Sequence, residues 1–303
     1  MEDYQIRLAA FDWLKKQSIL YGETIPREVL RTKFYFRNEH IPLVSPQGIF
    51  KPKLCNLPLT ITTTPKGPYK DIFDFSGNLL YKYRGNDINH RDNVGLRNLM
   101  QSNTPLIYFH GIVPGKYLPL WPIYIIGDNP DAFTFTVAVD AEMAIERPEK
   151  MVAEESRSRR SYITSEVKVR LHQCSFREKV IRAYRQQCAF CKLKHEELLD
   201  AAHIIPDSDP LGEPVITNGI SLCKIHHAAY DRFFIGITPD YQIVVKSELL
   251  EEEDGPMLKF GLQKMHDQKL YLPKSKIDWP NPDFLDRRFK EFLIISNNTL
   301  LRT

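Results

Sequence analysis

Hydrophobic and polar positions follow two patterns along the first 140 residues. Residues 4–20 are amphipathic, which predicts a helix ending near Gly22, and Thr24 is a suitable cap for a second short helix. Short apolar stretches broken by proline and glycine come next, a pattern typical of strands and turns. We therefore expect residues 1–140 to form a β-rich domain with a helical start.

The strand pattern ends in a charged segment. Further strands are expected over residues 105–110, 121–126 and 132–139. The segment that follows is polar, charged and poor in aromatic side chains, so we expect a linker over residues 141–170.

A helical pattern returns after the linker. Ser175 and Glu178 form a capping box that predicts a helix over residues 175–187, and another helix is expected near residues 281–295. We expect residues 171–303 to form a second domain, and the chain as a whole to be of the α+β class.

Composition narrows the class of protein. The chain has 303 residues, 43% of them hydrophobic, and no apolar run approaches the roughly 18 residues of a membrane span. The charged N-terminus is unlike a signal peptide, so a cytoplasmic location and no membrane partner are expected. Thirteen Lys or Arg face five Asp or Glu between Arg147 and Lys194. Such local charge suits a phosphate backbone, or alternatively a solvated linker and helix face.

The cysteines indicate a metal site. Their number is five, and an odd count argues against a disulfide framework. Cys188 and Cys191 are separated by two residues, as are Cys223 and His226, and each spacing lets two side chains converge. The two pairs predict a closed Cys3His site for structural Zn²⁺, the alternative being ordinary buried cysteines.

A second metal site is expected beside the first. On a helix that begins near Lys224, His227 and Asp231 are four residues apart and share a face, whereas His226 points toward the zinc. The segment from Leu198 to Ile205 is expected to be a strand, which places Asp200 and His203 on opposite faces. A second strand is expected to begin at Asn218-Gly219.

This order of strand, loop, strand and helix carries a family resemblance. Residues 188–235 resemble the HNH endonucleases, which have a ββα-metal fold. The matching residues are Ala201-Ala202-His203-Ile204, Asn218-Gly219, Leu222, His227, Tyr230 and Asp231.

The resemblance implies a role for each matching side chain. His203 resembles the general base that activates water, and Asn218 the residue that braces the loop or, in some members, binds metal. His227 and Asp231 would hold one catalytic Mg²⁺ (or Mn²⁺), leaving 5′-phosphate and 3′-hydroxyl ends. Many members have Asp or His where this chain has Ala202, so Asp200 is expected to replace that ligand.

The first domain is similar to the SRA domain, a barrel of the PUA-like kind that reads modified cytosine. The similarity rests on the acidic Asp71 and Asp74, Tyr83-Arg84-Gly85, Asp92-Asn93 with Leu96, and Pro105-Leu106-Ile107. It implies base flipping into a pocket where Tyr81 or Tyr83 stacks on the base and Asp71 or Asp74 reads its edge.

These expectations combine into one hypothesis. The protein is expected to be a restriction-type endonuclease that acts on double-stranded DNA carrying modified cytosine such as 5-methylcytosine, and to work as a homodimer. One alternative is an HNH restriction or homing-type nuclease that reads unmodified sequence. Another is a non-catalytic, zinc-stabilised DNA-binding protein.

Overall fold

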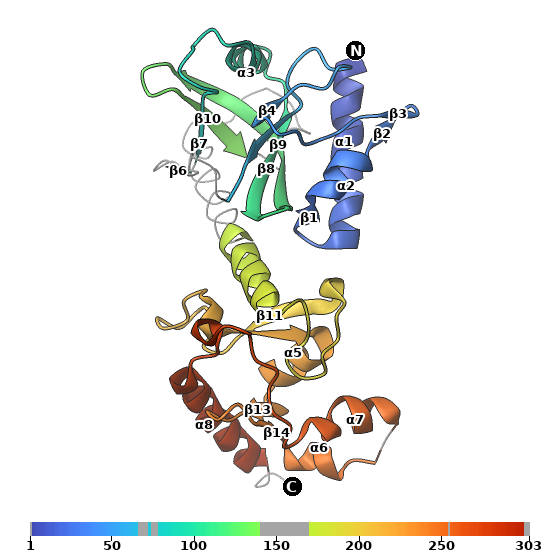
Figure 1. Cartoon of the computed structure of the whole chain (residues 1–303), viewed down its shortest axis with the longest axis vertical. Coiled ribbons are helices and arrows are strands. Elements are labelled where there is room, and N and C mark those ends of the chain that lie inside the picture. Colours follow the sequence, from blue (N-terminus) through green and yellow to red (C-terminus); the bar gives the residue numbers. More distant parts are fainter. Residues whose placement is uncertain (1, 66–71, 74–77, 140–169, 254, 300–303) are drawn as a thin grey trace, which may run out of the picture. The chain divides into compact units, whose positions relative to one another are not determined.

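The chain forms two compact units, Met1–Cys174 and Ser175–Thr303. The computed structural model describes residues 2–65, 72–73, 78–139, 170–253 and 255–299 (Figure 1). Of the linker expected over residues 141–170, only residue 170 is described, so the predicted domain boundaries stay predictions.

The first unit is built on one curled sheet. Its strands among the described residues are β1 (Ile25–Pro26), β4 (Ile49–Phe50), β5 (Thr60–Thr63), β6 (Ile72–Phe73), β7 (Leu79–Lys82), β8 (Leu106–Val113), β9 (Lys116–Asn129) and β10 (Thr134–Val139). The order is β4-β5-β8-β9-β10-β7-β6, with β1 on β9. All neighbours are antiparallel except β5 and β8. No pairing joins β4 to β6 among the described residues, so the barrel stays a prediction.

Three helices and a short hairpin complete the first unit as described: α1 (Glu2–Tyr21), α2 (Arg27–Thr32), α3 (Arg91–Gln101), and β2 (Tyr35–Phe36) with β3 (Glu39–His40). The helix expected over residues 4–20 is confirmed, and it buries Ile6, Ala10 and Leu14. The prediction that Thr24 caps α2 was wrong. The chain pairs with β9 at Ile25–Pro26 before it turns into α2, so Pro26 occupies the cap position.

The second unit is centred on a strand–strand–helix unit. β11 (Leu199–His203) pairs antiparallel with β12 (Gly219–Cys223), and α5 (Lys224–Asp231) follows directly. The helix before it covers residues 170–183, so Ser175 lies inside the helix and the predicted capping box was wrong. The spacing of Ser175 and Glu178 suits a helix start, but buried positions such as Leu171 and Cys174 extend the helix toward the N-terminus.

The remaining elements surround this unit. They are β13 (Ile235–Ile237), β14 (Ile243–Val245), α6 (Ser247–Glu251), α7 (Pro256–Gly261), α8 (Pro282–Thr299) and the short 3-10 helices Glu196–Leu198, Ile216–Asn218, Gln263–Met265 and Lys276–Asp278. The helix expected near residues 281–295 is confirmed by α8. Within the described ranges, no helix has the length and apolar character needed to cross a bilayer.

Candidate nuclease and metal sites

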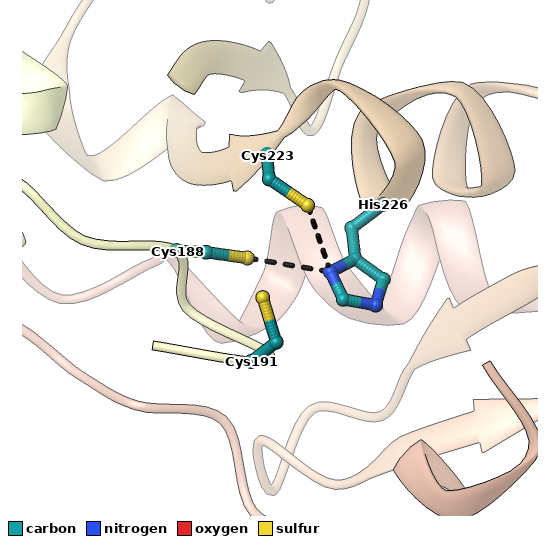
Figure 2. A group of neighbouring side chains, drawn as sticks. All are labelled: Cys188, Cys191, Cys223 and His226. Carbon is teal, nitrogen blue, oxygen red and sulfur yellow. Dashed lines mark hydrogen bonds between the residues drawn. The ribbon is translucent and has the colours of Figure 1, made fainter. Parts of the chain in front are cut away.

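Four side chains converge on one point in the second unit. The ligand atoms of Cys188, Cys191, Cys223 and His226 all lie within 4.8 Å of one another (Figure 2). The cysteine pair comes from the turn after the 170–183 helix, and the other two ligands come from the end of β12 and the first turn of α5. Three sulfurs and one imidazole nitrogen in this arrangement fit tetrahedral Zn²⁺, which leaves no open position for substrate.

The orientation of His226 supports this ligand set. Its Nδ1 lies 3.4 Å from Cys188 Sγ and 3.2 Å from Cys223 Sγ, and its Nε2 lies 2.6 Å from the carbonyl oxygen of Gly261. Donation from Nε2 to that carbonyl fixes the tautomer that turns Nδ1 toward the sulfurs. Hydrogen bonds from Cys188 and Cys191 hold the pKa of Cys223 far below its ordinary value, so the cluster already favours a thiolate.

His203 ends β11 and lies against an aromatic ring. The centroids of the His203 and Phe176 rings are 4.0 Å apart and their planes differ by 18°. His203 Nε2 is buried and has no hydrogen-bond partner among the described residues. Burial lowers the pKa of His203, and the nearby His227 acts in the same direction against Asp207 and Asp231. A neutral imidazole is the form of histidine that a general base requires.

A glycine allows this stacking. Gly219 pairs with His203 across the β11–β12 hairpin. A Cβ atom at position 219 would lie 2.4 Å from Val180 and 2.8 Å from Phe176, so only glycine lets the 170–183 helix come this close. In the sequence Phe176 is merely one apolar position of a helix, and the glycine after Asn218 is the signal that could have found the contact.

Asn218 is fully buried and joins two backbone segments. Its Oδ1 accepts from the amide of Ile205 at 2.9 Å, and its Nδ2 donates to the carbonyls of Ile205 and Glu213 at 3.0 and 3.1 Å. The Asn218 carbonyl also accepts from the amide of Ile204 at 3.0 Å. The side chain therefore fixes the chain immediately after His203, a geometry that favours bracing over metal binding.

His227 lies between two carboxylates. Its Nδ1 is 3.6 Å from Asp200 Oδ2, and its Nε2 is 3.1 Å from Asp231 Oδ2. Because the two contacts use opposite ring nitrogens, one metal ion bound to His227 in this orientation reaches one carboxylate and not both. Asp200 also lies 3.0 Å from Lys224 Nζ and 3.7 Å from Arg177 Nε, so cations already neutralise it.

The pair of His227 and Asp231 fits a divalent metal better. Neighbouring ligands of an octahedral Mg²⁺ with bonds of about 2.1 Å are roughly 3 Å apart. The 3.1 Å separation of His227 Nε2 and Asp231 Oδ2 agrees with that spacing, and half of the Asp231 side chain is exposed. Hydrogen bonds with Asp200 and Asp231 raise the pKa of His227 to about 9 against the effect of burial. A metal ion would displace that proton.

The first unit contains a separate cavity of about 580 Å³. Its described lining is largely apolar but includes the hydroxyl-bearing Ser45, Thr62, Thr63, Thr64, Tyr81, Tyr83 and Tyr117 and the basic Arg27, Lys82 and Arg84. Thr62 Oγ1 is buried and has no hydrogen-bond partner among the described residues. A volume of this size is typical of sites for small ligands.

The two predicted tyrosines differ in their surroundings. Both border the cavity, and 6% of Tyr81 and 1% of Tyr83 is exposed. Tyr83 stacks on Phe135, with ring centroids 4.6 Å apart, and its hydroxyl binds Asp128. The Tyr81 hydroxyl donates to the carbonyl of Thr62 at 3.3 Å, at the cavity wall. Asp71 and Asp74, the predicted readers of the base, lie outside the described residues.

Comparisons with known proteins agree with the arrangement of the second unit. Residues 188–238 match the family model described as HNH endonuclease, which confirms the family resemblance drawn from the sequence. No curated protein matches the chain.

Two solved structures are similar at low scores. A modification-dependent TagI restriction endonuclease has 14% identity and a TM-score of 0.30, with 78% of this chain and 81% of that chain covered. The Type IV phosphorothioation-dependent restriction endonuclease ScoMcrA has 16% identity and a TM-score of 0.25, with 60% and 51% covered. TM-scores of this size do not establish a common fold, so the functional conclusions rest on the site residues and the family match.

Proposed function

We propose that the protein is a metal-dependent DNA endonuclease of restriction type, because residues 188–238 form an HNH endonuclease domain. One observation carries the proposal. A half-buried, neutral imidazole, His203, lies on the strand that packs against the helix bearing His227 and Asp231. The zinc cluster is proposed to hold the ends of β12 and α5 in place.

Each residue of the site has a proposed task. The partly exposed imidazole of His203 takes the proton of the attacking water, and Asn218 holds the backbone that positions His203. His227 and Asp231 hold Mg²⁺ or Mn²⁺, which when bound stabilises negative charge on the phosphate and on the leaving 3′ oxygen. The products are a 5′-phosphate and a 3′-hydroxyl.

Asp200 is assigned a positioning task in place of metal binding. Its carboxylate lies 3.6 Å from His227 Nδ1, where its charge favours a proton on Nδ1 and so leaves Nε2 for the metal. This assignment differs from the ligand role expected from the sequence, and it follows from the opposite ring nitrogens that Asp200 and Asp231 contact.

The proposed roles of Asp200 and Asp231 are distinguished by metal titration in a His203→Ala background, so that DNA cleavage does not interfere. We expect Asp231→Asn to weaken Mn²⁺ binding by about 100-fold or more, because it removes a ligand. Asp200→Asn should weaken it by about tenfold, the lower end of the range for residues that orient a ligand. A larger effect for Asp200→Asn than for Asp231→Asn would reverse the assignment.

We propose that the first unit is an SRA-like reader and that its cavity receives the flipped, modified cytosine. The size of the cavity and the hydroxyl-bearing side chains that line it, Thr62 and Tyr81 among them, support this, because a flipped base is read by hydrogen bonds to its edge. Tyr81 is favoured over Tyr83 for contact with the base, since Phe135 already stacks on Tyr83.

The proposed recognition of modified cytosine by the first unit is tested by measuring DNA binding of the full-length His203→Ala chain. We expect tighter binding to duplexes with 5-methylcytosine or 5-hydroxymethylcytosine than to unmodified duplexes. Thr62→Val removes only an unpaired hydroxyl, so it should reduce this preference and leave thermal stability intact. Equal binding to all three duplexes would support instead a nuclease that reads unmodified sequence.

The proposed stoichiometry follows from the single nuclease site. The described parts of the chain contain one His203-type centre, and one such centre cuts one strand. We therefore propose that double-strand cleavage uses a homodimer, in which case nicked circular DNA should not accumulate during plasmid cleavage.

A further inference from the structure

One charged side chain is buried on α8, outside the residues that match the HNH family model. Arg288 is 7% exposed and lies on the same helix face as Leu285 and Phe292, which are also buried. Burying a guanidinium among apolar side chains costs free energy unless its donors are paired. The contacts of the Arg288 guanidinium therefore indicate its role in the structure.

The Arg288 guanidinium contacts both elements that carry the nuclease residues. Its Nη1 donates to the carbonyl of Ile204 at 3.3 Å, directly after His203 at the end of β11. Its Nη2 donates to the carbonyl of Tyr230 at 3.1 Å and lies 3.5 Å from Asp231 Oδ1, at the end of α5. Asp231 Oδ1 thus faces the arginine, while Oδ2 faces His227.

The position of the guanidinium is itself fixed by packing. Its central carbon lies 4.2 Å from the ring centroid of Tyr230 and 4.9 Å from that of Phe233. α8 lies close to β13 at Gly236, where a Cβ atom would come within 2.7 Å of Phe292. A rigid planar fork can span several acceptors at once, which a lysine ammonium in the same place cannot do.

We propose that Arg288 is a positioning residue of the nuclease site. It holds the strand end that carries His203 and the helix end that carries Asp231 at a fixed separation, and it turns Asp231 Oδ2 toward His227. This inference rests on the roles proposed above for His203 and Asp231. It extends the working site to α8, about fifty residues beyond the family match.

The neighbouring arginine offers a matched control. Arg287 is 45% exposed and its guanidinium pairs with Asp209, at 2.5 Å and 3.5 Å, with no contact to the nuclease residues among those described. Arg288→Lys and Arg287→Lys both keep the positive charge and both remove a fork. A difference between them therefore reports geometry and not net charge.

The test uses the full zinc-loaded chain and two readouts. Turnover is measured on cleavable DNA, and Mn²⁺ affinity is measured by electron paramagnetic resonance in the His203→Ala background. We expect Arg288→Lys to lower kcat by about tenfold or more with KM for DNA unchanged, because small misplacements of reacting groups cost rate. Its Mn²⁺ affinity should fall at least about threefold, and Arg287→Lys should match the wild type in both readouts.

The fraction of folded protein is measured for each variant, and rates are normalised to it. Arg288→Gln, which keeps an amide donor but removes the charge, provides a second variant if Arg288→Lys does not fold, and the same loss of kcat is expected. Arg288 variants with wild-type kcat and Mn²⁺ affinity per folded molecule would overturn the inference. Undiminished cleavage by His203→Ala would instead overturn the proposed function on which it rests.

Discussion

At the scale of single residues, His203 gains its chemistry from its neighbours. Its proposed role as the general base was a prediction from the order of histidines and asparagine along the chain, and it stays a prediction. The ring of Phe176 was not predicted, because the contact depends on how closely one helix approaches Gly219. The sequence also did not predict that Asp200 and Asp231 contact opposite ring nitrogens of His227. Residue spacing places two side chains on one helix face but does not orient the imidazole.

The stacking on Phe176 has a consequence for pH dependence. Burial lowers the pKa of His203 below its ordinary value of about 6.5, so the neutral base persists to lower pH and activity is lost only as pH falls through that lowered pKa. Phe176→Ala should expose the ring, raise its pKa and move the acid limb of the rate profile to higher pH. Single-turnover rates between pH 5 and 8 measure this.

A matched control separates stacking from packing. Val180→Ala also removes buried apolar atoms that lie against Gly219, but Val180 does not stack on His203. Its acid limb should remain that of the wild type. An unchanged acid limb in Phe176→Ala would show that the ring does not control the titration of His203.

At the scale of elements, the apolar pattern predicted the strands β11 and β12, and ligand spacing predicted the Cys3His cluster, because short spacings fix which side chains can converge. Neither pattern predicted the contributions of distant elements. Tertiary packing brings the carbonyl of Gly261, at the end of α7, to His226 of the metal cluster. It also brings the Arg288 guanidinium, on α8, to the nuclease residues. Neither contact leaves a local pattern in the sequence. The early start of the 170–183 helix was missed because a capping-box sequence lies within it.

The zinc cluster should hold these elements together. Cys223→Ser is expected to abolish the bound zinc and lower the melting temperature of the second unit, because binding of structural Zn²⁺ contributes directly to folding. Zinc content by elemental analysis and melting by circular dichroism measure the two effects. Cys55→Ser is the control, since Cys55 belongs to the first unit and burial raises the pKa of its thiol to about 12, which keeps it neutral. Full zinc content in Cys223→Ser would contradict the ligand assignment.

At the scale of the whole molecule, the α+β class was predictable, and the resemblance implied a pocket at Tyr81 or Tyr83, but the other residues that line the cavity were not predictable. Gly48, Thr62 and Tyr81 meet there from segments far apart in the chain, and the sheet order joins β5 to β8 and β10 to β7. Such non-sequential pairing is set by global packing, so the sequence identified Tyr81 without its partners. We therefore propose separate functions for the two units: the first, which has the cavity, reads DNA, and the second, which has the Cys3His cluster, cuts it.

The most direct measurement is cleavage of plasmid DNA, with and without modified cytosine, by wild-type protein and by His203→Ala in Mg²⁺ or Mn²⁺. We expect the wild type to produce 5′-phosphate ends only when metal is present. His203→Ala should slow cleavage by about 100-fold to 10,000-fold, the range for loss of a general base. Cleavage by His203→Ala at the wild-type rate, or wild-type cleavage that persists in a metal chelator, would contradict the proposed function.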